Sequence, residues 1–167
     1  MLHGMIYASH AKHLDTDPAN DFADEAHAYF GTGTQLQEMY ITPALLSQKN
    51  WDTLAESAKW ARENADTLVD THWVGGDPAK GEVYGWASWS PRKGILTLRN
   101  PDDKAAKTSI DIATAFELPD GAPKRYTARS PWSQDHDKPA IELIAGQPHT
   151  FELAPFEVLT LEATAVP

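Results

Sequence analysis

The segment that decides the fold is "EVYGWASWSPRKGILTLRNPDD", which runs from Glu82 to Asp103. Two runs of β-branched and aromatic residues flank a Pro-Arg-Lys-Gly turn, a pattern typical of an antiparallel hairpin. Trp86 and Trp89 lie three positions apart in the first run, so on a strand they point to opposite faces. Rings at this density either stack on the apolar side of a sugar or fill a core, and filling a core is the commoner role. At most one of the two tryptophans could then form an aromatic platform, and the hairpin as a whole is interpreted as core.

Short predicted strands continue from this hairpin to the C-terminus. Turn residues such as Pro, Gly, Asn and Asp separate them at regular intervals. The predicted strands are 82–90, 94–100, 107–116, 123–129, 139–144, 148–153 and 156–163. This spacing predicts an antiparallel β-sandwich over residues 76–167.

Residues 1–75 have a mainly helical pattern. The clearest helix is 50–70, with Asn50 as its N-cap. Two earlier helices are predicted at 3–14 and 19–31, and "QLQEMYIT" at 35–42 reads as a short strand. One face of the 50–70 helix is predicted to carry the apolar residues Trp51, Leu54, Ala58, Ala61, Ala65 and Leu68.

The turn sequence Gly75-Gly76-Asp77-Pro78 separates the two parts. The predicted fold class is therefore α+β, with domains at 1–75 and 76–167. A single strand at 35–42 cannot pair its own edges. Either the helices form a small bundle, or residues 1–75 are a piece of a larger parallel barrel. The alanine-rich face of the 50–70 helix implies close packing against a broad surface and favours the barrel.

Composition excludes several classes of function. With 14 basic and 24 acidic residues, the net charge of −10 argues against nucleic acid and anionic lipid as partners. The chain contains no cysteine, which excludes disulfides, thiolate metal sites and cysteine nucleophiles. No apolar run approaches the roughly 20 residues of a membrane span. No phosphate loop, nucleophile elbow or HExxH pattern occurs, and no cofactor is expected.

The segment from Leu36 to Pro101 resembles the C-terminal region of the α-galactosidase-like and endo-α-N-acetylgalactosaminidase-like retaining glycoside hydrolases. The hairpin from Gly85 to Pro101 is the most specific match. In these enzymes a (β/α)8 barrel precedes an antiparallel β domain. The resemblance implies that 35–42 is the last barrel strand, 50–70 the last barrel helix and 76–167 the C-terminal sandwich. It also implies a parent protein that acts on α-galactosides or α-N-acetylgalactosaminides.

The catalytic residues of such an enzyme are not found in this sequence. Retaining hydrolysis uses two carboxyl groups about 5 Å apart, and in these barrels they lie at the ends of middle strands. Those strands would precede Met1, and no segment here matches either catalytic motif. The resemblance therefore implies a chain that is inactive alone. The N-terminus does not read as a signal peptide, and the compartment stays open, including a secreted or periplasmic parent.

Four residues are candidates for substrate binding under this mapping. His3 would follow the seventh barrel strand, and Glu38, Tyr40 and Thr42 would lie in or at the end of the eighth. Barrel enzymes bind substrate at the carboxyl ends of their strands, so these side chains could form hydrogen bonds with a sugar. The alternative is that they are ordinary loop or helix-start residues. A severed barrel would also leave an apolar face bare, through which the chain could self-associate.

Other clusters carry weaker hypotheses. His10 and His13 have the spacing of metal ligands, but without a third ligand no metal site is predicted. "DTHW" at 70–73 mixes groups suited to acid–base chemistry, but Trp73 is interpreted as an interdomain wedge and His72 as structural. Trp132 with its polar neighbours at 135–137 is interpreted as a solvated loop, with a calcium or sugar contact as the alternative. The alternative function is a free-standing, non-catalytic carbohydrate-binding or interaction module, and the third hypothesis is a fragment without autonomous function.

Overall fold

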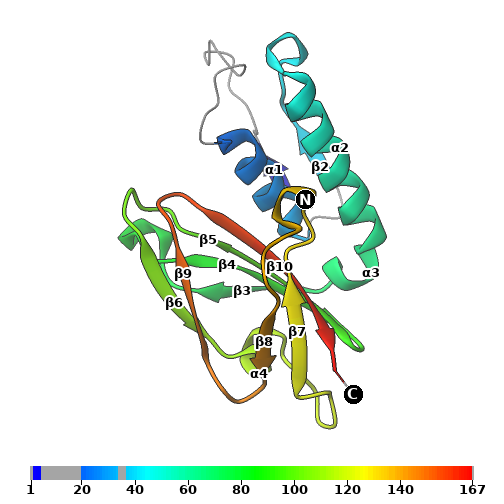
Figure 1. Ribbon diagram of the computed structural model, residues 1–167, viewed down its shortest axis with the longest axis vertical. Helices are drawn as coiled ribbons and strands as arrows, with labels where there is room; N and C mark the ends of the chain where they lie inside the picture. Colours follow the sequence, from blue (N-terminus) through cyan, green and yellow to red (C-terminus); the bar gives the residue numbers. More distant parts are fainter. Residues whose placement is uncertain (1, 5–19, 34–36, 167) are drawn as a thin grey trace.

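The computed structural model describes residues 2–4, 20–33 and 37–166. Within these ranges helices and antiparallel sheets are combined, so the α+β class is confirmed. Figure 1 shows the helices α1, α2 and α3 together on one side of the antiparallel strands. Over the same ranges, no helix combines the length and the apolar character that crossing a membrane requires.

The predicted antiparallel strands form two sheets in the described part of the chain. The larger sheet has the order β3-β4-β5-β10-β7-β8, and β6 pairs with β9 in the smaller one. All pairs in both sheets are antiparallel, as the sequence predicted. The strands are β3 (Thr71–Gly75), β4 (Tyr84–Ser90), β5 (Lys93–Arg99), β6 (Ala106–Ile110), β7 (Arg125–Arg129), β8 (Ile141–Ile144), β9 (His149–Leu153) and β10 (Val158–Ala165).

Strand β3 contains the residues just before the boundary placed at Gly75. It pairs antiparallel with β4, from Thr71 opposite Ser88 to Gly75 opposite Tyr84. The larger sheet therefore begins within the segment that the sequence assigned to the helical part. The turn predicted after Gly75 is present in the structure. Gly75 and Gly81 have φ of 85° and 74°, and Pro78–Lys80 form the 3-10 turn η3.

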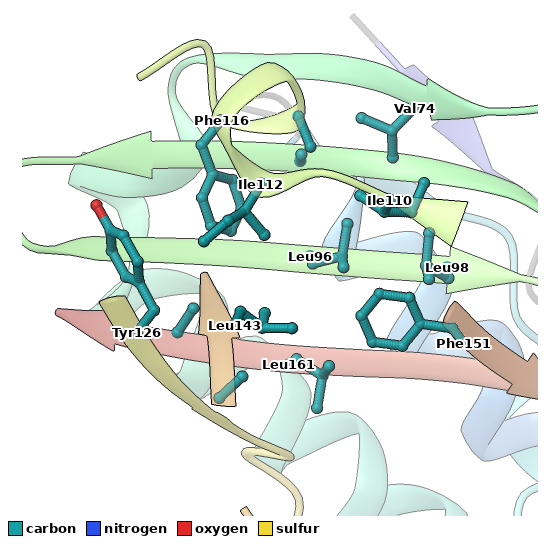
Figure 2. Close-up of a cluster of buried hydrophobic side chains, with 14 of the residues drawn as sticks. Val74, Leu96, Leu98, Ile110, Ile112, Phe116, Tyr126, Leu143, Phe151 and Leu161 are labelled. Atoms are coloured by element: carbon teal, nitrogen blue, oxygen red, sulfur yellow. The ribbon is translucent and has the colours of Figure 1, made fainter. Parts of the chain in front are cut away.

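A first apolar core fills the space between the two sheets (Figure 2). Leu96 and Leu98 of β5 and Leu161 of β10 face Phe151 of β9, and all four are buried. The strand predicted at 107–116 is wrong in its second half, where the short helix α4 (Ile112–Ala115) forms. The Asp111 carboxylate accepts a hydrogen bond from the Ala113 N–H at 2.8 Å and begins this helix. The turn directs Ile112 and Phe116 into the core (Figure 2).

The N-terminal part contains two parallel strands joined through a helix. Strand β1 (Leu2–Gly4) pairs in parallel with β2 (Gln37–Met39), and α1 (Asp21–Gly31) lies between them in the sequence. The helix predicted at 3–14 is therefore wrong at its first two residues, and 5–14 lie outside the described residues. The strand predicted at 35–42 is shorter but has a partner, so it is not the single strand that the sequence suggested.

The predicted 50–70 helix is divided into α2 (Gln48–Glu63) and α3 (Ala65–Leu68), after the 3-10 turn η2 (Pro43–Leu45). Ser47, not Asn50, is the N-cap, and Asn50 completes a capping box with it. The buried face contains Ser57, Trp60 and Ala61. Trp51 is 38% exposed and Ala65 is also exposed, so the predicted face is wrong at these two residues. Satisfying the capping box sets the rotation of the first turn, which periodicity alone could not reveal.

A second core joins the helices to the outer face of the larger sheet. Helix α1 packs against β5 and β10, and α3 packs against β4 and β5. Trp60 of α2 and Ile95 of β5 are both buried in this cluster. The contact is close, because a Cβ built on Gly31 would lie 2.3 Å from Thr97 Oγ1. The helical part is therefore packed directly on the sandwich.

Candidate functional site

The predicted subsite, by which we mean His3, Glu38, Tyr40 and Thr42, lies around the parallel pair β1–β2. The strand register places His3 directly opposite Glu38, so His3 lies within β1 rather than after the strand. Tyr40 follows β2 and is 47% exposed. Thr42 precedes the η2 turn, and its side chain forms no capping hydrogen bond there. The topology therefore brings these positions to one end of the helical part.

Glu38 is the chemically most capable residue of the predicted subsite. Its exposed carboxylate accepts a hydrogen bond from the Tyr40 hydroxyl at 3.1 Å, and its carbonyl oxygen accepts one from Tyr29 at 3.0 Å. The hydrogen bond to Glu38 raises the pKa of Tyr40 above its ordinary value of 10.0. The Tyr40 hydroxyl donates its one hydrogen to Glu38, so the lone pairs of this hydroxyl and the second carboxylate oxygen of Glu38 offer acceptors for the hydroxyl groups of a sugar.

The two tryptophans of the decisive hairpin have different environments. Trp89 packs against the inter-sheet core, and its indole Nε1–H donates to the Tyr126 hydroxyl at 3.0 Å. Trp86 faces the side of the sheet on which the helices lie. There it contacts Trp73 edge-to-face, with ring centroids 5.9 Å apart, and Tyr84 in the same way at 5.6 Å. We call Trp73, Tyr84 and Trp86 the aromatic strip.

Trp73 does not act as a wedge among the described residues. Its indole is 54% exposed and is stacked on Tyr84, with ring centroids 5.0 Å apart and an interplanar angle of 12°. Trp132, not Trp73, packs between the helices and the larger sheet, so its interpretation as a solvated loop residue is wrong. It is buried, stacks on His27 at 3.9 Å and meets Trp60 edge-to-face at 4.9 Å. Among its neighbours, Asp135 accepts a hydrogen bond from Ser130.

His27 lies in this joint between helices and sheet. Burial lowers its pKa from 6.5 to about 4, so the imidazole is neutral at pH 7. A pocket of about 500 Å³ borders it, lined also by Lys49, Asp52 and Glu56. The sequence did not indicate this pocket, because its residues come from three separate segments.

A second pocket, which we call the edge pocket, lies where the two sheets meet beside β3. Its volume is about 490 Å³, and β3, the end of β6 and α4 form its walls. His72 is one of its polar residues. Its Nδ1 lies 3.3 Å from Glu117 Oε1, and its Nε2 lies 3.5 Å from Asp70 Oδ1. The edge pocket is lined by His72, Val74, Ile110, Asp111, Thr114 and Glu117, among others.

The signal for the edge pocket in the sequence is the "DTHW" segment, with its mixture of groups suited to acid–base chemistry. The sequence did not indicate that Asp111 and Glu117 line the same pocket, because the pattern of residues 107–116 predicts one straight strand. No group of three or more His, Asp or Glu in the described ranges is arranged to hold a metal ion. His10 and His13 lie outside those ranges.

No protein-family model matches the sequence. No curated protein matches it either. Solved structures do match, over 87% of this chain. A Bacillus halodurans protein assigned as an α-N-acetylgalactosaminidase has a TM-score of 0.61 at 12% identity, with 32% of its chain covered. Mortierella vinacea α-galactosidase I has a TM-score of 0.56 at 12% identity, with 36% covered. This chain shares the fold of the C-terminal part of such glycoside hydrolases.

The likeness extends beyond α-galactosidases. The α-amylase of Geobacillus thermoleovorans has a TM-score of 0.57 at 11% identity, with 34% of its chain covered. The chain thus spans about a third of the length of each of these structures. The resemblance found in the hairpin sequence is confirmed as a likeness of fold, and the choice of sugar does not follow from it.

Proposed function

We propose that this chain is the C-terminal part of a glycoside hydrolase that acts on α-galactosides or α-N-acetylgalactosaminides. Residues 1–75 supply the end of its (β/α)8 barrel, and residues 76–167 form the sandwich that supports it. The catalytic carboxylates belong to a part of the parent protein outside this chain. The chain alone does not hydrolyse glycosides.

The observation that carries this proposal is the order β1–α1–β2–α2 with β1 and β2 parallel. Strand, helix, parallel strand and helix is the repeating unit of a (β/α)8 barrel. Parallel strands normally belong to larger sheets that are covered on both faces. Here β1 and β2 have only three residues each and do not form such a sheet by themselves. Further strands beside β1 and β2 would complete the sheet, which fits the coverage of about a third of each matching structure.

The sandwich has a mechanical role in this proposal. Arg99 of β5 forms an ion pair with Glu25 of α1, and its Nη1 donates to Glu25 Oε2 at 3.1 Å. Glu162 of β10 accepts hydrogen bonds from Trp60 of α2 and from Asn64, the residue that caps the end of α2. These polar contacts fix both helices on one face of the sheet. Fixed helices in turn hold the end of β2, and with it Glu38 and Tyr40, in one position.

The substrate role of the predicted subsite follows from its place. Glu38 is the middle residue of the three-residue strand β2, and Tyr40 follows its carboxyl end, the end at which barrel enzymes bind substrate. Both are exposed, and their side chains are joined by one hydrogen bond. In the parent protein they would form hydrogen bonds with the hydroxyl groups of the bound sugar, and Thr42 and His3 would lie beside them.

The test compares the chain with a version extended by the sequence encoded upstream of Met1. Hydrolysis of 4-nitrophenyl α-galactopyranoside and of the α-N-acetylgalactosaminide is measured for both proteins. We expect turnover only by the extended protein, and we expect Glu38→Ala to raise KM there. Glu63→Ala, an exposed change on α2, is the matched control. Turnover by the chain alone, or no open frame upstream, would contradict the proposal.

Self-association follows from the same proposal. If β1 and β2 lack their neighbours, the exposed face of the helical part is free to pair with a second copy. Light scattering after size exclusion should therefore show dimers or larger species for the chain alone and a smaller tendency to associate for the extended protein. A strictly monomeric chain at high concentration would remove this part of the proposal.

A second function, a non-catalytic carbohydrate-binding module, is favoured by one specific observation. The aromatic strip presents a half-exposed Trp73 beside Tyr84 and Trp86. Exposed indole rings stack against the C–H face of sugars, so the strip is a platform of the required kind. Two results together would favour this second function over the first. The chain alone would bind a sugar, with weaker binding by Trp86→Ala, and no open reading frame would precede Met1.

A further inference from the structure

We propose that the edge pocket binds a single pyranose residue and is an accessory sugar site, separate from the predicted subsite. The ligand class rests on the proposed function, because the parent is a carbohydrate-active enzyme in that proposal. The site itself rests on the walls of the pocket, its polar groups and its position at the edge of the sandwich.

The walls of the edge pocket combine an apolar floor with a polar rim. Val74, Ile110 and Ala115 belong to the inter-sheet core and also line the pocket. Ser109, Asp111 and Thr114 supply oxygen atoms beside them. A pyranose has the matching arrangement, since its axial C–H groups make one apolar face and hydroxyls surround the ring. A volume of about 490 Å³ accommodates one sugar ring with its hydration water.

The polar rim is suited to a neutral ligand with hydroxyl groups. Asp111 and Glu117 are hydrogen-bond acceptors, and neither an anionic sugar acid nor a phosphate would be favoured beside their carboxylates. One oxygen of Asp111 is already occupied by the N–H groups of Ala113 and Gly146, both at 2.8 Å. The Thr114 hydroxyl has no hydrogen-bond partner among the described residues, so it is free to donate to a ligand.

His72 belongs to the lining of the edge pocket and is held by two acidic neighbours. Carboxylates lie on both sides of the imidazole, with Glu117 at Nδ1 and Asp70 at Nε2. Glu117 lies just after α4 with φ of 46°, the left-handed position that commonly ends a helix, and the Leu118 N–H donates to the Ala113 carbonyl oxygen at 3.0 Å across it. The end of α4 therefore sets the direction from which the Glu117 carboxylate reaches His72.

Trp73 extends the site across the free edge of β3. Side chains alternate along a strand, so Trp73 faces the side of the sheet opposite to His72 and Val74. Strand β3 pairs only with β4 among the described strands. A longer oligosaccharide could therefore place one ring in the edge pocket and the next against the indole, which is 54% exposed. The recognition element is then one ring in the pocket with an optional second ring on Trp73.

The experiment is an NMR titration of the full chain with methyl α-galactopyranoside, N-acetylgalactosamine, glucose and sodium glucuronate. At about 10 mM, a ligand with a Kd of 1 mM is nearly saturating. We expect shifts at the amides of 72–75 and 109–117 with at least one neutral sugar, and weaker or no shifts with the glucuronate. Thr114→Val should weaken binding about fivefold through the loss of one hydrogen bond. Glu117→Gln should weaken it about tenfold, because it removes a charged acceptor.

Matched controls separate this site from the others. Thr164→Val changes an exposed threonine of β10 that does not line the edge pocket, and it should leave the Kd unchanged. Trp51→Ala removes an exposed indole of α2 and should also have no effect. Trp73→Ala should weaken a disaccharide more than a monosaccharide.

Three results would overturn the inference. They are no shifts with any neutral sugar, shifts confined to residues 37–42, and equal shifts for Thr114→Val and the unmodified chain. The outcome is independent of the proposed function, because hydrolysis by the extended protein is measured separately. Turnover without edge-pocket shifts would refute only the accessory site, and edge-pocket shifts without turnover would refute only the hydrolase.

Discussion

Replacing Glu162 by alanine should loosen the helical part from the sandwich. Glu162 lies on β10, and its Oε1 accepts the Trp60 Nε1–H at 2.5 Å and the Asn64 Nδ2–H at 3.0 Å. Its Oε2 lies 3.0 Å from Lys93 Nζ. One carboxylate thus joins α2 to two strands of the larger sheet. Trp60 and Asn64 are 6% and 5% exposed, so water cannot easily replace the lost acceptor.

The magnitude follows from these contacts. Each hydrogen bond to a charged group contributes about 1.5 kcal/mol, and leaving a buried donor without a partner is costly. The Lys93 pair is partly exposed, so it adds about 0.5 kcal/mol. Glu162→Ala should therefore lower the free energy of unfolding by about 3–4 kcal/mol. With an m-value of about 2 kcal/mol/M in urea, the midpoint would fall by about 1.5–2 M.

The assay is urea unfolding followed by tryptophan fluorescence and by far-UV circular dichroism. Glu152→Ala is the matched control, because Glu152 pairs with Lys107 at 3.0 Å on the exposed surface, and it should cost at most about 0.5 kcal/mol. Glu162→Gln retains an acceptor oxygen and should lie between the two. If Glu162→Ala and Glu152→Ala have the same midpoint, the carboxylate does not join the helices to the sheet, and the reasoning fails.

Three further predictions concern single side chains. Burial, and then repulsion by Glu157, raise the pKa of Asp24 from 3.8 to about 7. The folded protein therefore holds this proton more tightly than the unfolded chain and loses stability as the pH rises from about 4 to about 7. Asp24→Asn should remove this loss and be about 1 kcal/mol more stable at pH 8 in thermal melts, allowing for partial exposure. Gly85→Ala would place a Cβ 1.9 Å from the Thr97 carbonyl oxygen, so the protein should be recovered mainly as aggregate. Asn100 is fully buried, and its side-chain amide donates to the carbonyls of residues 104 and 154 at 2.8 Å, so Asn100→Ala should lower the urea midpoint by about 1 M.

The antiparallel strands could be predicted because their signals are local. Alternating apolar residues and turn sequences lie within a few positions of each other, and they place most strand boundaries within two or three residues. The exception is the stretch after Ile110, where β-branched residues continue the strand pattern. There the Asp111 carboxylate caps a short helix, and a single capping hydrogen bond outweighs weak strand propensity.

The joint between helices and sheet could not be predicted, because its residues are remote in sequence. Trp132 meets His27 and Trp60, and none of the three lies within 25 residues of another. Trp73 was expected to fill this role because it directly follows the helix, which is an argument from sequence proximity. The edge pocket was missed for the same reason, since His72 and Glu117 meet only after α4 turns the chain.

The exposed aromatic residues support two different proposals at two places. Tyr40 and Trp51 belong to the helical part, next to β2 and on the first turn of α2. A continuing barrel would lie near both and could cover them. Trp73 belongs to the edge strand of the sandwich, and its stacking on Tyr84 fixes the ring while half of it stays exposed. A ring that is fixed by a neighbour loses little entropy when a ligand stacks on it. The helical part is therefore better suited to packing against further strands and helices, and the edge of the sandwich to binding a small sugar.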